Sequence, residues 1–112
     1  MTRKREYEDY LRDMLEATEK VAVFIRGMTR EGFLADEKTQ FAVVRGLEII
    51  GEAAKKLPDG FKSEHPTIPW REVSGMRDKL AHDYFGVNAE VVWKTAIEDL
   101  PPIAEALRRM LS

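Results

Sequence analysis

Apolar residues recur at intervals of three and four positions along most of the chain, which is the spacing of one face of an α-helix. The clearest series keeps these steps over about three heptads and consists of Tyr7, Leu11, Met14, Thr18, Val21, Ile25 and Met28. It predicts a long first helix over residues 5–29. Gly32 lies in the turn that we expect to end this helix.

A second amphipathic series follows Asp36, a residue type that is suited to capping a helix N-terminus. It predicts a helix that continues to Leu57, because Pro58-Asp59-Gly60 then stops it. The apolar face of this helix comprises Phe41, Val44, Leu47, Ile50, Ala54 and Leu57. Small residues such as Gly46 would let another backbone come close.

A narrow polar line of Arg45, Glu48 and Glu52 runs through this otherwise apolar helix. One interpretation is a solvated edge with ion pairs along the helix surface. The other is that one of the two acids is the partner of Arg77 in the next helix, or shapes a cleft.

Three prolines make residues 58–69 a stiff connection, which we expect to be a loop. His65 precedes Pro66 in this loop, and we interpret it as a structural or solvated residue. Pro69 followed by Trp70 indicates the entry to a third helix over residues 70–84. Gly86 is suited to ending that helix, and Asn88 to capping a fourth one.

The fourth helix keeps one apolar stripe across two consecutive prolines, and this stripe comprises Trp93, Ala96, Ile97, Leu100, Ile103, Ala104, Leu107 and Leu111. Proline interrupts helical hydrogen bonding, so we expect the last helix to be kinked or split at Pro101-Pro102. Together these elements predict one all-α domain over residues 1–112, folded as an antiparallel four-helix bundle.

Composition narrows the class of protein. The 112 residues are 44% hydrophobic and 34% charged, as in ordinary soluble globular domains. The absence of cysteine excludes a disulfide scaffold and a thiol nucleophile. No stretch resembles a signal peptide or a membrane span, which favours a cytoplasmic protein. A net charge of -2 argues against broad non-specific binding to nucleic acid, although it leaves room for a local basic cleft.

One charge lies within the apolar face of the third helix. At about 100° per residue, the members of this face fall within one arc, and they are Trp70, Val73, Met76, Leu80, Ala81 and Tyr84. Arg77 lies in the middle of that arc, where an unpaired guanidinium would be costly to bury. Either Arg77 has a partner, or this face lines a cleft that needs a charge. His82 points to the far side of an ideal helix, so the two residues converge only if the helix ends near His82 or if two copies of the chain face each other.

An arginine and a histidine five residues apart are suited to cleaving RNA without a metal or other cofactor. Histidine exchanges protons near neutral pH, and arginine binds a phosphate and stabilises charge that develops on it. RNA supplies its own nucleophile, the 2′-hydroxyl. Spacing alone is a weak signal, because Arg-x4-His is common by chance and a histidine near a helix end is more often a cap or a surface residue.

The segment from Arg77 to Tyr84 resembles the Arg-x4-His-x-Tyr motif of the HepT-like branch of the HEPN superfamily. The preceding His-Pro-Thr-Ile-Pro-Trp-Arg segment, residues 48–55 and the Asp-Leu-Pro sequence at Asp99 are also similar to this family. The resemblance covers nearly the whole chain. Asp78 occupies the polar position that follows the arginine in the HEPN pattern.

This resemblance implies a homodimeric toxin of a toxin–antitoxin pair, which cleaves RNA in a cleft where the motifs of two protomers meet. Arg77 and His82 would be catalytic, and Asp78 would orient or assist them. The implied partner is the nucleotidyltransferase MntA, which transfers AMP from ATP to the motif tyrosine, here Tyr84. Judged from the burial pattern alone, Tyr84 would instead be a packed aromatic whose hydroxyl is bonded to the backbone.

Two other function classes remain open. In the first, the chain is a non-catalytic helical module that binds the nucleotidyltransferase, and Arg77 and His82 hold a nucleotide or phosphate. In the second, it is a purely structural bundle with a satisfied buried arginine. Alanine substitutions at Arg77 and His82 separate these classes, since loss of RNA cleavage with the fold retained supports only the ribonuclease.

Overall fold

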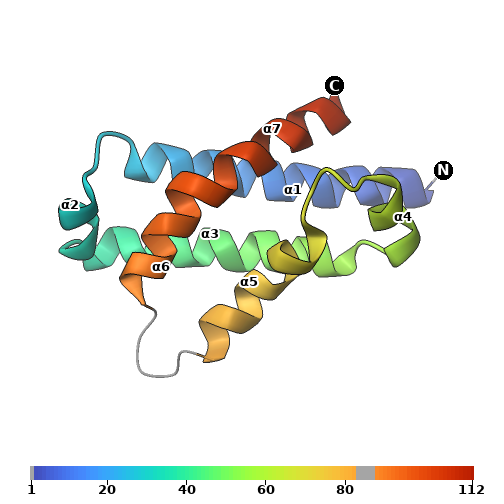
Figure 1. Ribbon diagram of the computed structural model, residues 1–112. Coiled ribbons are helices and arrows are strands. Elements are labelled where there is room, and N and C mark those ends of the chain that lie inside the picture. The colour runs from blue at the N-terminus through green and yellow to red at the C-terminus, as the bar shows by residue number, and fades with distance from the viewer. Residues whose placement is uncertain (1, 83–87) are drawn as a thin grey trace.

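The computed structural model describes the backbone of residues 2–82 and 88–112, and the side chains of residues 7–76 and 88–112. These residues form helices joined by short connections, with no strand in the described ranges (Figure 1). In chain order the elements are α1 (Thr2–Ile25), α2 (Arg30–Leu34), α3 (Glu37–Lys56), α4 (Asp59–Glu64), α5 (Trp70–His82), α6 (Ala89–Lys94), the π-helical segment η1 (Thr95–Asp99) and α7 (Leu100–Leu111). The all-α bundle expected from the sequence is therefore confirmed.

The two longest helices, α1 and α3, run antiparallel and pack along most of their length (Figure 1). Their close approach depends on Gly46, because a Cβ atom at that position would lie 2.6 Å from Cγ2 of Val21. The α1 side of this seam is the heptad-like series, whose central members Leu11, Met14 and Val21 are almost fully buried. The periodicity along the first helix therefore identified its core face correctly.

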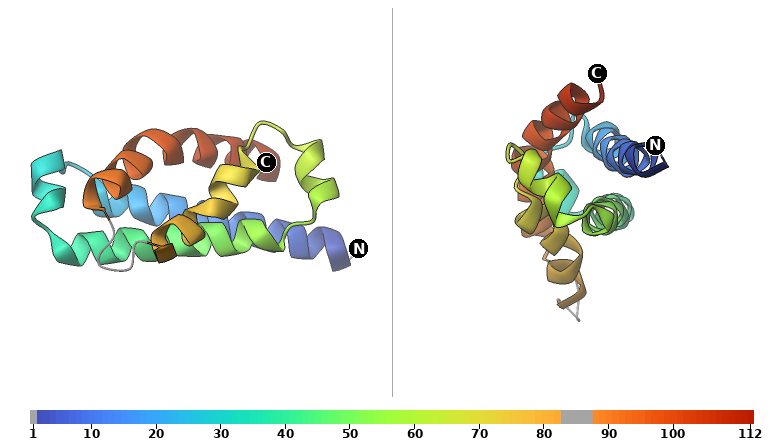
Figure 2. Two further views of the ribbon diagram at one scale, coloured as in Figure 1. Left: turned by 60° about the horizontal axis from the view of Figure 1, so that its bottom comes forward. Right: turned by 90° about the vertical axis from the view of Figure 1, so that its right-hand side faces the viewer.

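The other helices form a second layer on one side of this pair, as the end-on view in Figure 2 shows. Within that layer, α5 packs on α3, whereas η1 and α7 pack on α1. The core lies between the two layers and includes Phe33, Val43, Leu47, Ile50, Val73, Val92 and Leu107. The opposite face of the α1–α3 pair is covered by no described element of the chain.

The first helix ends earlier than the apolar pattern predicted. Gly27 adopts a φ of +77°, the left-handed conformation that commonly follows a helix C-terminus, and α1 stops at Ile25. Gly32 does not end that helix but lies within α2, where its N–H donates to the hydroxyl of Thr29 over 3.0 Å. Helix α2 forms because it buries Phe33 completely, against the ring of Trp93 at 5.3 Å between centroids.

The Asp36 cap and the end of α3 agree with the prediction. The Oδ1 atom of Asp36 accepts a 3.0 Å hydrogen bond from the N–H of Thr39, and the helix ends at Lys56, one residue before Leu57. The connection over residues 58–69, in contrast, is not only a loop. It contains the six-residue helix α4, which places Phe61 beside Tyr7 of α1, with 5.2 Å between the ring centroids.

The expected irregularity of the last helix is present, but it precedes the prolines. Helix α6 begins after Asn88, whose side chain accepts from the N–H groups of Glu90 and Val91. The chain then widens into η1, where the N–H of Leu100 donates to the carbonyl of Thr95. This shift lies directly before Pro101 and Pro102, which have no N–H to donate, and α7 continues through both prolines.

Within the part of the chain that the structure describes, no helix has the length and apolar character required to cross a bilayer.

Candidate active site on helix α5

Helix α5 begins at an anchored residue, Trp70. The indole Nε1–H of Trp70 donates to the carbonyl oxygen of His65 over 2.9 Å, and only 8% of the residue is exposed. The N–H of Val73 donates to the carbonyl of Pro69 over 3.0 Å, which closes the first turn. The start of the helix that bears the motif is therefore fixed both by packing and by hydrogen bonds.

His65 takes part in this anchor. Its ring lies 4.5 Å from that of Phe61, centroid to centroid, and its carbonyl accepts from Trp70. Phe61 also contacts Trp70 edge-on at 6.3 Å. These contacts fit the structural role that we expected for His65.

The apolar face predicted for α5 packs on α3 as far as the side chains are described. Val73 is completely buried, Trp70 nearly so, and Met76 is half-buried against the core. Leu80 and Ala81, the next members of the stripe, lie beyond the described side chains.

The motif occupies the C-terminal part of α5. The backbone of Arg77, Asp78 and His82 is helical, whereas their side chains, and the whole of Tyr84, lie outside the described residues. Because α5 is helical through His82, the positions of Arg77 and His82 are about 140° apart around the helix axis and about 7.5 Å apart along it. The two positions therefore face different directions within one protomer.

A cleft opens beside α5, between this helix and the η1–α7 segment. It has a volume of about 280 Å³, and Val73, Met76 and Ile103 are among its apolar lining residues. Three carboxylates also line it, those of Glu72, Glu98 and Asp99, and no basic side chain of the described residues does. This side of α5 is consequently unfavourable for a nucleic-acid backbone.

Ser74 is the polar residue of α5 that faces the interior. Its Oγ atom is buried and has no hydrogen-bond partner among the described residues.

The polar line on α3 is in part a solvated edge. Nη1 of Arg45 and Oε2 of Glu48 are 3.9 Å apart, and both side chains are well exposed. Such exposed pairs contribute little to stability. Glu52 is half-buried and takes part in an interaction. Whether an acid of α3 is the partner of Arg77 falls outside the described side chains.

No group of three or more histidine, cysteine, aspartate or glutamate residues in the described ranges is arranged to hold a metal ion.

The acidic cleft was not anticipated from the sequence, because its carboxylates come from helices that are far apart along the chain.

Residues 14–110 match the family described as Ribonuclease HepT-like, and the matched region contains the whole motif. The chain is 57% identical over 100 residues to the "Probable ribonuclease HepT" of Thermococcus cleftensis, covering 89% of this chain and 91% of that protein.

Further relatives agree with this match. A protein of Caldanaerobacter subterraneus named "Putative RNase" is 41% identical over 102 residues, with 91% of each chain covered. A protein of Methanocaldococcus jannaschii with the same description is 44% identical over 98 residues, covering 88% of this chain and 81% of that one. No solved structure gives a significant match.

Proposed function

Because this chain belongs to the HepT-like ribonuclease family, we propose that it is a metal-independent endoribonuclease and the toxin of a toxin–antitoxin pair. The observation that carries the proposal is the family match over residues 14–110, which includes Arg77, Asp78, His82 and Tyr84. The rigid entry of α5 supports it, since the motif is carried by a helix anchored at Trp70.

In the proposed mechanism, the 2′-oxygen of the substrate attacks the adjacent phosphorus while the bond to the 5′-oxygen breaks. His82 exchanges a proton with the reacting oxygens, taking one from the 2′-hydroxyl or giving one to the leaving 5′-oxygen. The guanidinium of Arg77 binds the phosphate and stabilises the negative charge that develops on it. Asp78 orients or assists these two groups. All atoms of the reaction come from the RNA and from exchangeable protons, so no cofactor takes part.

The geometry of α5 supports a site shared between two protomers. Arg77 and His82 lie about 140° apart on the same helix, which is unfavourable for their joint contact with one phosphate. A two-fold axis beside the C-terminal part of α5 would bring Arg77 of each protomer near His82 of the other, which gives two equivalent Arg77–His82 pairs. A homodimer with two equivalent sites is therefore the assembly that we propose.

The charge of the neighbouring cleft constrains the path of the RNA. Glu72, Glu98 and Asp99 line the side of α5 nearer its N-terminus. A phosphate chain would be repelled there. We therefore place the RNA across the C-terminal end of α5, away from this cleft.

The proposed control of the enzyme is transfer of AMP to Tyr84 by a cognate nucleotidyltransferase, an MntA-like antitoxin. An AMP group next to the site would add bulk and a negative charge where the RNA phosphate must bind. The modified protein would then bind RNA poorly.

A second candidate function is a non-catalytic module that binds the nucleotidyltransferase and holds its nucleotide. The acidic cleft favours a protein partner over RNA on that side of α5, and this observation keeps the alternative open. Under this alternative Arg77 and His82 bind a phosphate but cleave nothing.

An RNA-cleavage assay in the presence of a chelator tests the proposal. We expect the wild type to cleave single-stranded RNA, and Arg77→Ala and His82→Ala to lose at least about a hundredfold in rate. His65→Ala is the matched control, because the chain contains two histidines and alanine keeps the main-chain carbonyl that accepts from Trp70. Absence of cleavage by the folded wild type would support the non-catalytic module instead, and cleavage that persists in a folded His82→Ala variant would contradict the role proposed for His82.

A further inference from the structure

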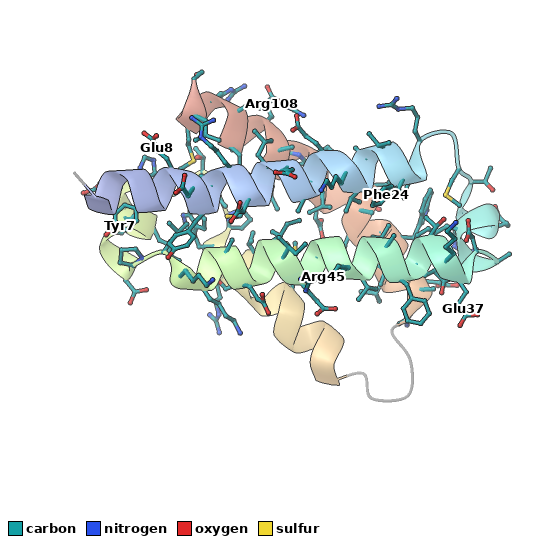
Figure 3. All side chains as sticks on the ribbon, turned by 180° about the vertical axis from the view of Figure 1, so that it is seen from behind. Tyr7, Glu8, Phe24, Glu37, Arg45 and Arg108 are labelled. Carbon is teal, nitrogen blue, oxygen red and sulfur yellow. The ribbon has the colours of Figure 1, made fainter. Side chains whose placement is uncertain are left out.

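The outer face of the α1–α3 pair, opposite the core, carries a groove. One section of it, of about 290 Å³, is lined from both helices by Ala17, Lys20, Val21, Phe24, Ala42, Arg45, Gly46 and Ile49. A second section of about 190 Å³ is lined by Asp13, Glu16, Ala17, Lys20 and Ile49. The two sections share three residues and therefore form one continuous groove along the seam. Figure 3 shows this face of the α1–α3 pair, with Phe24 and Arg45 labelled on it.

Large apolar side chains are exposed on the same two helices. Phe24 is 45% exposed, Val23 55% and Phe41 70%. Phe24 lines the groove, and Phe41 precedes the groove residue Ala42. Exposed aromatics beside an apolar groove are typical of an interaction surface. We propose that this groove is an interface between two copies of the chain, separate from the face of α5 that carries the motif.

The residues of α1 that face the groove support a second copy as the occupant. Tyr10, Asp13, Ala17, Lys20 and Phe24 follow one another at steps of three and four residues, so they form a second stripe on α1 beside the core stripe. Asp13, Ala17, Lys20 and Phe24 line the groove, and Tyr10 extends the stripe toward the N-terminus.

This second stripe is complementary to itself in the antiparallel direction. When two copies of α1 cross at Ala17 around a two-fold axis, Lys20 of one copy lies beside Asp13 of the other, and the reverse pair forms as well. Phe24 likewise lies beside Tyr10 of the other copy, because both are seven residues from Ala17. The two-fold axis thus forms two pairs of opposite charge and two pairs of aromatic rings. Ala17, the smallest side chain of the stripe, lies at the point where the two helices cross.

The charges of the groove are available for such pairing. In the isolated chain, Nζ of Lys20 is 3.1 Å from Oε1 of Glu16 in the same helix, and both side chains are more than half exposed. An exposed pair of this kind holds its partners weakly. Lys20 can therefore turn to an acid of the second copy at little cost.

The test is the mass of the full-length protein in solution, measured by sedimentation velocity and light scattering. We expect Lys20→Glu to weaken the association by about tenfold or more, because it sets like charges against each other at two symmetric positions, and so to halve the mass at moderate concentration. Asp13→Lys should have the same effect. The double variant Asp13→Lys, Lys20→Glu reverses both charges and should restore the wild-type mass.

Arg109→Glu is the matched control. Nη2 of Arg109 is 2.7 Å from Oε1 of Glu105 in an i,i+4 pair like that of Lys20, but it lies on α7, outside the groove. This substitution should leave the mass unchanged. Helical circular dichroism checks that all variants are folded.

The mass measurement is independent of any ribonuclease activity. If the α5 face also pairs, Lys20→Glu reduces the larger assembly to the dimer that the α5 face forms, and otherwise it converts a dimer to a monomer. A mass unaffected by Lys20→Glu, or not restored by the double variant, would overturn the proposal and assign the groove to a different occupant.

Discussion

The indole N–H of Trp70 donates a 2.9 Å hydrogen bond to the main-chain carbonyl of His65, five residues earlier. This bond closes the turn that leads from α4 into α5 and buries the tryptophan at the edge of the core. The helix that carries the arginine and histidine of the motif is therefore held at its start by a residue that has no part in the chemistry.

Trp70→Phe should destabilise the protein by about 1–3 kcal/mol, because it removes the indole hydrogen bond to the His65 carbonyl and part of a nearly buried ring. Thermal or urea unfolding measures this loss. Trp93→Phe is the matched control, since Trp93 is half-buried against the core and packs on Phe33. If Trp70→Phe cost no more than Trp93→Phe, the hydrogen bond would not be the anchor that we describe.

Gly46→Ala should also destabilise the fold, by about 1–3 kcal/mol, because its Cβ would overlap the side chain of Val21 and push α1 and α3 apart. The double variant with Val21→Ala should cost less than the sum of the two single changes, which urea unfolding can measure. Gly75→Ala is the matched control, because a Cβ there meets nothing within 4 Å and alanine is the better helix former. Simple additivity of the Gly46 and Val21 substitutions would argue against this close contact.

The free energy of unfolding should depend on pH through the carboxyl group of Asp36, which caps the N-terminus of α3. The hydroxyl of Thr39 donates to Oδ2 over 2.6 Å, and this bond, together with the N–H of Thr39, holds the pKa of Asp36 below its ordinary value. A carboxyl with a lowered pKa stabilises the fold above its unfolded pKa, and this stabilisation is lost as the pH falls through its folded pKa. The loss should therefore occur at acid pH, below about 4.

Asp36→Asn separates this effect from the other carboxyls, because asparagine still accepts from the backbone but does not titrate. Urea midpoints of the wild type and Asp36→Asn should converge as the pH is lowered, with the wild type more stable at neutral pH. A constant difference between them at all pH values would show that Asp36 does not titrate in this way.

Much of this fold could be predicted from the sequence, because its signals are local. Asp36 marks the start of α3, Asn88 the start of α6, and the period of apolar residues marks the buried face of α1. The end of α1 was misplaced, because Gly27 and Gly32 are both plausible breaks and only the burial of Phe33 decides between them.

Other features depend on contacts that no local pattern records. Helix α4 has six residues between prolines and is held by Phe61, which packs on Tyr7 and Trp70. The acidic cleft brings Glu72 to the same surface as Asp99, although the two are far apart in sequence. The motif itself was found by resemblance, since its spacing alone is weak and its side chains lie outside the described residues.

Tyr84→Phe should abolish the transfer of AMP by the cognate nucleotidyltransferase and leave RNA cleavage largely intact. The reason is that the phenol oxygen would be the acceptor of AMP but would take no part in the cleavage step. Mass spectrometry after incubation with the partner and ATP measures the modification. Tyr7→Phe and Tyr10→Phe are the matched controls, because the chain contains three tyrosines. AMP found on Tyr7 or Tyr10, or an unmodified wild type, would exclude the role proposed for Tyr84.

In the site that we propose, Arg77 of one protomer acts with His82 of another on the same phosphate. This pairing can be measured by mixing the Arg77→Ala and His82→Ala variants, unfolding and refolding them together, and assaying RNA cleavage. Each variant alone should be inactive, whereas random pairing leaves one intact site in half of the dimers and restores about a quarter of the wild-type rate of RNA cleavage. A refolded mixture of dimers as inactive as either variant alone would contradict a site shared between two protomers.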